Sequence, residues 1–132
     1  MKTFRELTVW QRAHELVLAI YHATTNFPSH EQYGLVSQMH RAAVSVAANI
    51  AEGHKRRSRK EFLNFLGVAD GSLEELKYHV LLSKDLRYLT PECAEQLYQH
   101  AETVGRMLSR LRQHIEQEVT HVASRNRTSV TV

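Results

Sequence analysis

Apolar residues recur at alternating steps of three and four along four segments of the chain, which is the period of an α-helix. The expected helices cover residues 8–27, 29–52, 58–87 and 91–118. The connections between them are short, so consecutive helices should lie antiparallel as neighbours. We find no segment with the alternation typical of a strand. The pattern therefore predicts an all-α, up-down-up-down four-helix bundle.

Residues that favour helix ends stand near these boundaries. Thr8, Ser29 and Ser58 each precede a Gln or Glu by three residues, which is the pattern of a capping box. Thr90 is followed by proline, which is favoured at the first helical position because its missing N–H costs nothing there. Gly53 fits the position just past the end of the second helix.

The third segment carries glycine in its interior, at Gly67 and in the pair Gly71-Ser72. Interior glycine costs roughly 1 kcal/mol relative to alanine. The common compensation is the close approach of a neighbouring backbone, and a local kink is the alternative. We expect close packing of this segment on the alanine-rich second helix.

Length and composition fit one folded domain. The chain has 132 residues, of which 42% are hydrophobic and 23% are charged, with two prolines and five glycines. All four expected helices fall within residues 1–119. Residues 120–132 are polar with scattered valine, so we expect them to form a disordered tail.

The second helix presents three faces on a helical wheel. They are an apolar stripe of Leu35, Met39, Ala43, Val46 and Ile50, a polar arc of Gln38, Arg41, Ser45, Asn49 and Glu52, and a small apolar flank of Val44, Ala47, Ala48 and Ala51. Either the polar arc faces water, or it is partly buried against another helix or subunit and its groups bond one another. In the second case Arg41 needs a carboxylate, because an unpaired buried charge is costly. Glu75 on the third helix is the best candidate, and it completes a candidate structural network with Arg41, Ser45, Asn49 and Glu52.

Charge and cysteine content indicate the compartment and the partner. The formal net charge of +3 and the pI near 9.2 favour an acidic partner such as nucleic acid, although many other soluble proteins share them. The single Cys93 excludes an intramolecular disulfide and fits a reducing compartment. The first residues lack the apolar core of a secretory signal, and no stretch approaches the roughly 20 apolar residues of a membrane span. We expect a cytoplasmic protein with no membrane contact.

Several short motifs follow one another along the chain. They are residues 4–7 (FREL), 9–13 (VWQRA), 27–28 with Glu31 and 33–35 (YGL), 38–53 ending in SVAANIAEG, 61–66 and 69–76 (ADGSLEEL). In this order they resemble the four-helix-bundle family named for proteins encoded in intervening sequences of 23S ribosomal RNA genes. Two departures are His40, where the family often has a second basic residue, and Ala47-Ala48, where Pro-Ser is common.

The resemblance implies a left-handed four-helix bundle that assembles into a homopentameric barrel. The family is also similar to the accessory protein of diversity-generating retroelements, which binds nucleic acid and a reverse transcriptase through a basic barrel surface. The partners implied in this way are further copies of the chain, RNA or DNA, and a reverse transcriptase. An older description of the family as ribosomal proteins reflects gene location, and we do not carry it over as a function.

The sequence does not predict a metal site or a catalytic site. No two of the nine histidines have the i, i+4 spacing that places two ligands on one helical face, and Cys93 has no partner cysteine for a zinc site. No glycine-rich loop is placed to hold phosphate, and no nucleophile with an adjacent base is evident. Ser45 is expected to be a packing residue, and acidic residues of the third helix are expected to face solvent. We therefore expect a protein that is not an enzyme and has no cofactor.

The strongest chemical signal is a basic run between the second and third helices. Its five cations are Lys55, Arg56, Arg57, Arg59 and Lys60, and further cations follow at Arg106, Arg110 and Arg112 and at Arg125 and Arg127. Phosphate binding through released counterions grows with the number of charges neutralised, and an oligomer multiplies the patch. No aromatic residues interleave with the run, so base stacking is not indicated. A solubilising loop is the alternative interpretation.

Three functional hypotheses result. The first is a non-enzymatic, homo-oligomeric scaffold or accessory protein that binds nucleic acid through Lys55, Arg56, Arg57, Arg59, Lys60, Arg106 and Arg110. The second is a protein–protein interaction module with no nucleic-acid role. The third, a small enzyme at a subunit interface, ranks last. Oligomerisation is expected in the first two, because alanine-rich flanks leave apolar surface for a neighbour.

Overall fold

The protein is built from four α-helices. A computed structural model describes the backbone of residues 3–130 and the side chains of residues 3–126. The helices are α1 (Thr8–Ala23), α2 (Leu35–Lys55), α3 (Arg59–Asp85) and α4 (Pro91–Val130), with short 3-10 helices η1 (Phe4–Glu6) and η2 (Ser29–Glu31) before α1 and α2. No strand occurs within residues 3–130. The predicted all-α class is confirmed.

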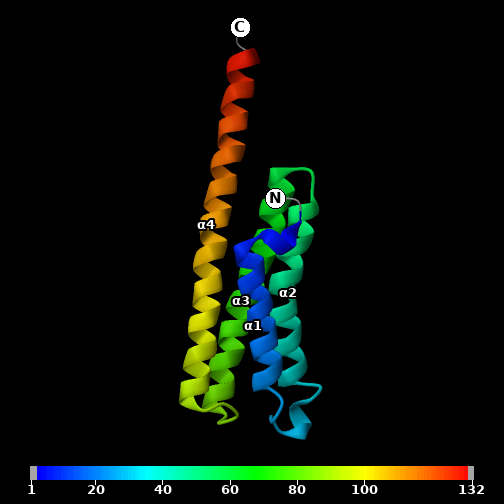
Figure 1. Ribbon diagram of the computed structural model, residues 1–132, viewed down its shortest axis with the longest axis vertical. Helices are drawn as coiled ribbons and strands as arrows, with labels where there is room; N and C mark the ends of the chain where they lie inside the picture. The colour runs from blue at the N-terminus through cyan, green and yellow to red at the C-terminus, as the bar shows by residue number, and fades with distance from the viewer. Residues whose placement is uncertain (1–2, 131–132) are drawn as a thin grey trace.

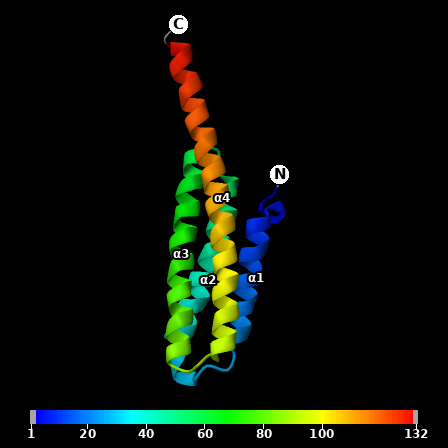
Figure 2. The same ribbon diagram turned by 90° about the vertical axis from the view of Figure 1, so that its left-hand side faces the viewer.

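The helices form a bundle in which α1 and α3 each pack on α2 and α4. Consecutive helices run in opposite directions (Figures 1 and 2). The connection between α2 and α3 therefore lies at the same end of the bundle as the start of α1. At this end α4 continues well past the other helices (Figure 1).

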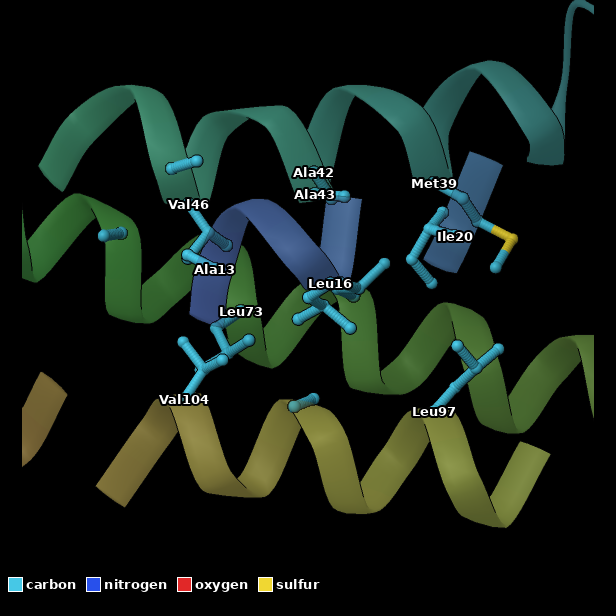
Figure 3. Packing of buried hydrophobic residues seen from close by; sticks show 14 of the residues in the cluster. Ala13, Leu16, Ile20, Met39, Ala42, Ala43, Val46, Leu73, Leu97 and Val104 are labelled. Carbon is cyan, nitrogen blue, oxygen red and sulfur yellow. The ribbon is translucent and has the colours of Figure 1, made fainter. Parts of the chain in front are cut away.

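One apolar core runs through the bundle, and all four helices contribute to it. Figure 3 shows side chains from all four helices, among them Leu16, Val46, Leu73 and Val104, pointing into the space between the helices. Burying one such side chain contributes about 1.5–3 kcal/mol. Ser83 is a fully buried polar residue here, and its hydroxyl donates to the carbonyl oxygen of His79 at 2.7 Å. The core thus satisfies its buried hydroxyl locally.

Two of the predicted helix caps are confirmed. The Ser58 hydroxyl accepts a hydrogen bond from the Glu61 backbone N–H at 3.1 Å, and Thr90 Oγ1 accepts one from the Cys93 N–H at 3.1 Å. Thr8 was expected to cap the first helix, but it is the first residue of α1, and Leu7 precedes it without a side-chain cap. The first helix also ends at Ala23 rather than at residue 27.

The second helix begins later than its capping pattern predicted. Ser29 lies in η2, and α2 starts at Leu35. The carboxylate of Glu31 supplies the cap instead, because its Oε1 accepts a hydrogen bond from the Leu35 N–H at 3.3 Å. Hydrogen bonds from the Tyr88 hydroxyl and then from Leu35 lower the pKa of Glu31, which favours a negative charge at the positive end of the helix.

Gly53 does not end the second helix but lies inside it, buried against α3. A Cβ atom added at Gly53 would lie 2.7 Å from Phe65 Cβ and 2.8 Å from Phe62 Cδ1. These distances are shorter than any van der Waals contact, so only glycine allows α2 and α3 to approach this closely. The helix continues for one further half-turn to Lys55.

The two glycines of α3 do not have the predicted role. A Cβ at Gly67 would find as its neighbour Arg112 Nη2 of α4, at 4.0 Å, and a Cβ at Gly71 would meet no atom within 4 Å. Neither position brings α3 close to α2. The close approach that the sequence placed at Gly67 and Gly71 occurs at Gly53.

The predicted disordered tail is wrong for residues 120–130, because α4 continues to Val130 rather than ending at 118. Residues 106–132 contain neither glycine nor proline, so nothing in the local sequence stops the helix. Val119, Val122 and Ala123 also extend the apolar stripe of α4 at steps of three and four. Residues 131–132 lie outside the described part of the chain.

His40 joins α2 to α1. Its Nε2 atom lies 2.8 Å from Thr24 Oγ1, and its ring stacks on Tyr21 with 3.7 Å between the ring centroids. Burial lowers the pKa of His40. The family position that often holds a basic residue is therefore used here for packing between helices.

We predict opposite effects for alanine at two glycines. Gly53→Ala should lower the free energy of unfolding by about 1–3 kcal/mol, because the methyl group overlaps two phenylalanines. Gly71→Ala should raise it by up to about 1 kcal/mol, because the space is open and alanine favours the helix. Urea denaturation followed by circular dichroism measures both values. Equal stability of Gly53→Ala and the wild type would contradict the close approach.

His40 should make stability depend on pH. Its pKa in the folded protein is below the ordinary value of about 6.5, so the unfolded chain binds this proton more readily. The free energy of unfolding should therefore fall as the pH decreases from 6.5 through the folded pKa and should not change on this account at higher pH. Denaturation curves across this range should show a smaller fall for His40→Gln than for the wild type. His22→Gln, an exposed control on α1, should behave like the wild type, and an identical pH dependence in His40→Gln would refute the prediction.

Candidate nucleic-acid interface and polar network

The basic run forms an exposed turn between α2 and α3. Lys55 ends α2, Arg59 begins α3, and the Arg56 N–H donates to the Gly53 carbonyl at 3.1 Å. We call Lys55, Arg56, Arg57, Arg59 and Lys60 the basic turn, and all five residues are exposed. Residues 54–60 contain no apolar side chain, so nothing in this segment packs into the core and its cations face solvent.

Two cations of the basic turn are held by neighbouring side chains. The Arg56 guanidinium lies over the ring of Phe65, 4.7 Å from its centroid. Arg59 Nε lies 2.9 Å from Glu118 Oε2, and the other oxygen of this carboxylate lies 2.9 Å from His114 Nε2. One carboxylate therefore offsets one of the five charges and ties the turn to α4.

The other cations of the turn have no such partner among the described side chains. Within the described residues, Lys55, Arg57 and Lys60 take part in no ion pair. These three charges are therefore available to an external anion. All three lie within residues 55–60, at the connection between α2 and α3, which concentrates positive charge at this end of the bundle.

Arg106 and Arg110 do not join the basic turn. Arg106 is exposed on α4 and donates to Thr103 Oγ1 at 3.2 Å. Arg110 borders a hollow of about 220 Å³ beside Thr8 and Val9, at the start of α1. Along the axis of α4 it lies roughly 12 Å from Glu118, the residue that contacts the turn. The cations predicted as one surface thus fall into the basic turn and a separate pair on α4.

Part of the polar arc of α2 is bonded at the seam with α3. Ser45 Oγ lies 2.7 Å from Ser72 Oγ, and Asn49 Nδ2 donates to the Ser45 carbonyl at 2.8 Å and to its hydroxyl at 3.0 Å. All three side chains are half-buried. For Ser45 and Asn49, the polar arc is therefore partly buried against a neighbouring helix and does not simply face water.

The predicted pairing of Arg41 with Glu75 is wrong. Glu75 Oε2 lies 2.9 Å from Nε2 of the buried His79, one turn along the same helix. Arg41 is exposed and forms no ion pair with any described residue, so it needs no buried carboxylate. Arg41 and Glu75 border a polar hollow of about 310 Å³. Glu52, the last member of the predicted network, is exposed and bonds to none of the others.

Four contacting residues were not identified from the sequence. Ser72 completes the seam, His79 binds Glu75, Phe65 supports Arg56, and Glu118 binds Arg59. Two of these pairs join different helices, and the pair of Phe65 with Arg56 joins α3 to the turn before it. Their spacing along the chain therefore carries no local signal, whereas Glu75 and His79 share the i, i+4 spacing that brings side chains together on a helix.

A groove lies between the start of α3 and the extended part of α4. Its volume is about 560 Å³, and it is lined by Ser58, Arg59 and Lys60 from one side and by Glu118, Val119, His121, Val122, Ala123 and Asn126 from the other. The basic turn therefore continues into a groove with an apolar floor. The sequence did not predict this groove, because four of its α4 residues, His121, Val122, Ala123 and Asn126, fall in the segment expected to be a disordered tail.

The described residues show neither a metal-ligand cluster nor a membrane-spanning helix. No three His, Cys, Asp or Glu side chains within residues 3–126 gather closely enough to hold a metal ion. None of the helices in this part of the chain combines the length and apolar character that crossing a membrane requires.

Comparison with known proteins identifies the family. The family model described as 23S rRNA-intervening sequence protein matches residues 5–110. The chain belongs to this family. The chain is also similar to a protein of unknown function from the S23 ribosomal protein family of Bacteroides thetaiotaomicron. The crystal structure of that protein shares 24% sequence identity with this chain, with a TM-score of 0.71, and the match covers 79% of this chain and 97% of the other. That likeness supports the fold, and no curated protein shows a significant match.

We predict that Ser45 and Ser72 are energetically coupled. Each single change to alanine should lower the free energy of unfolding by about 0.5–1.5 kcal/mol. The double variant should lose less than the sum of the two, by about 0.5–1 kcal/mol, because the hydroxyls bond each other. Denaturation of the four proteins in the cycle gives this value. Pairing Ser45→Ala with Ser29→Ala, an exposed serine in η2, should give additive losses, and additivity in the Ser45–Ser72 cycle would show that the bond contributes nothing.

Proposed function

We propose that this protein is a non-enzymatic, homo-oligomeric helical scaffold that contacts RNA or DNA through its basic turn. The supporting observation is that all five cations of the turn are exposed, while among the described side chains Arg59 alone of the five pairs with a carboxylate, that of Glu118. A cationic turn that served only solubility would also bind a polyanion weakly. The distinguishing quantities are the affinity for nucleic acid and its dependence on the basic turn.

The proposed binding is electrostatic. Lysine and arginine neutralise phosphates and release condensed counterions, so affinity falls steeply as salt increases. Lys55, Arg57 and Lys60 are free of internal ion pairs within the described residues. One turn offers few phosphate contacts, and several turns on one oligomer raise the overall affinity by linking these contacts.

Oligomerisation is part of the proposal, and the pentamer implied by the family resemblance is the form we propose. Apolar side chains exposed on the outside of α1 and α2 support it. Leu18 is 57% exposed, Tyr21 46% and Val44 42%, and Ala48 is exposed beside Val44. Such patches favour contact with a neighbouring protein surface.

The same apolar residues support a second candidate, a protein–protein interaction module. Tyr78 and Val68 on α3 are 60% and 54% exposed, which adds apolar surface on another side of the bundle. In this case the partner is a protein such as the reverse transcriptase implied by the resemblance, and nucleic acid is bound weakly even at low salt.

Glutamine substitutions distinguish the two. Replacing Lys55, Arg56, Arg57, Arg59 and Lys60 together by glutamine should abolish binding of labelled RNA or DNA at low salt, measured by fluorescence anisotropy, because the phosphate contacts are lost. A retained affinity in this variant would contradict the nucleic-acid proposal and favour the protein-binding module.

A pair of double variants controls for net charge. Arg57→Gln with Lys60→Gln should weaken binding and reduce the magnitude of the salt slope by about two. Lys84→Gln with Arg87→Gln removes the same charge from exposed positions at the opposite end of the bundle and should have a much smaller effect. Equal losses from the two pairs would show that overall charge, and not the basic turn, determines binding.

A further inference from the structure

The groove between α3 and α4 combines two kinds of surface. Arg59 and Lys60 form a cationic wall on the α3 side, and Val119, Val122 and Ala123 form an apolar floor on α4. Val122 is 52% exposed. The groove is continuous with the basic turn, because Arg59 and Lys60 belong to both.

A ligand that matches this groove needs negative charge beside a flat apolar surface. Nucleic acid has both, in its phosphates and in the faces of its bases. In a duplex these faces are stacked on one another and are not accessible, whereas in a single strand they are free to pack on protein side chains. The apolar floor therefore discriminates between the two forms, and the cationic wall alone does not.

We infer that the groove seats an unstacked base of a single-stranded nucleic acid, with the adjoining phosphates on Arg59, Lys60 and the rest of the basic turn. This inference rests on the proposed function and adds the class of nucleic acid. His121 and Asn126 also line the groove. A histidine ring stacks on bases, and an asparagine amide both donates and accepts hydrogen bonds at a base edge.

Glu118 sets how strongly the phosphates are held. Its carboxylate lies in the same groove and is bonded to Arg59 at 2.9 Å, so it competes with a phosphate for this guanidinium. Removing this charge strengthens backbone contacts to single and double strands alike. Removing the apolar floor affects only the seated base. The two contributions are therefore separable by substitution.

The base-contacting surface comes from α4 and not from the basic run itself. Residues 54–60 contain no aromatic side chain, so the basic run has no stacking surface of its own. Because α4 continues, the floor reaches the cations from a segment far away in the sequence.

The test compares one oligonucleotide as a single strand and as a duplex of the same length, by fluorescence anisotropy with the full chain. The wild type should bind the single strand about tenfold more tightly. Val122→Ser should weaken single-strand binding to near the duplex value and leave duplex binding unchanged. Val68→Ser is the matched control, because Val68 is 54% exposed on α3 and does not line the groove. It should keep the wild-type preference.

Glu118→Gln should tighten binding of both forms by a similar factor, while Glu116→Gln, which removes the same charge from an exposed α4 position outside the groove, should have a smaller effect. Circular dichroism checks that each variant keeps its helical content.

Equal affinity of the wild type for both forms, or an unchanged preference in Val122→Ser, would overturn the inference and leave the proposed function intact. Loss of an oligomer in Val122→Ser by light scattering, with unchanged affinity, would also overturn it by showing that a second copy covers the groove. If the wild type binds neither form, the proposed function itself fails.

Discussion

The bundle depends on how closely α2 and α3 approach at Gly53. With no side chain at this position, the ring of Phe62 and the Cβ atom of Phe65 lie against the backbone of α2. This contact fixes the direction in which the chain leaves α2 and enters α3. Arg56, in the turn that follows α2, lies over the Phe65 ring. The same phenylalanine thus contacts both Gly53 of α2 and a cation of the basic turn.

The fourth helix completes the surface that the seam begins. Arg59 reaches Glu118 across the end of the bundle, and α4 continues beyond this point to Val130. An isolated helix segment is marginally stable in water, and burial of its apolar face stabilises it. The extended part of α4 keeps Val122 exposed, so its apolar surface beside the groove is not covered by the rest of the bundle.

The sequence predicted the features that depend on burial periodicity and on local hydrogen bonds. The apolar stripes located all four helices, and Ser58 and Thr90 cap their helices as expected. The sequence pattern placed Gly53 just after the helix rather than inside it, because a glycine that follows a helix and a glycine at a contact between helices leave the same pattern in the sequence. The predicted Arg41–Glu75 pair does not form, because Glu75 binds His79 one turn along α3 and Arg41 is exposed and needs no carboxylate. The groove could not be predicted, because it depends on the continuation of α4 past residue 118, and the polar composition of residues 120–132 favoured a disordered tail.

The most direct measurement is photocrosslinking of bound RNA to the protein, followed by mass spectrometry of the crosslinked peptides. It locates the contact without altering any residue. We predict crosslinks within residues 55–60 and within residues 119–126, on the two sides of the groove. Crosslinks confined to the opposite end of the bundle, at η2 or at the connection between α3 and α4, would contradict a surface organised by the Gly53 seam.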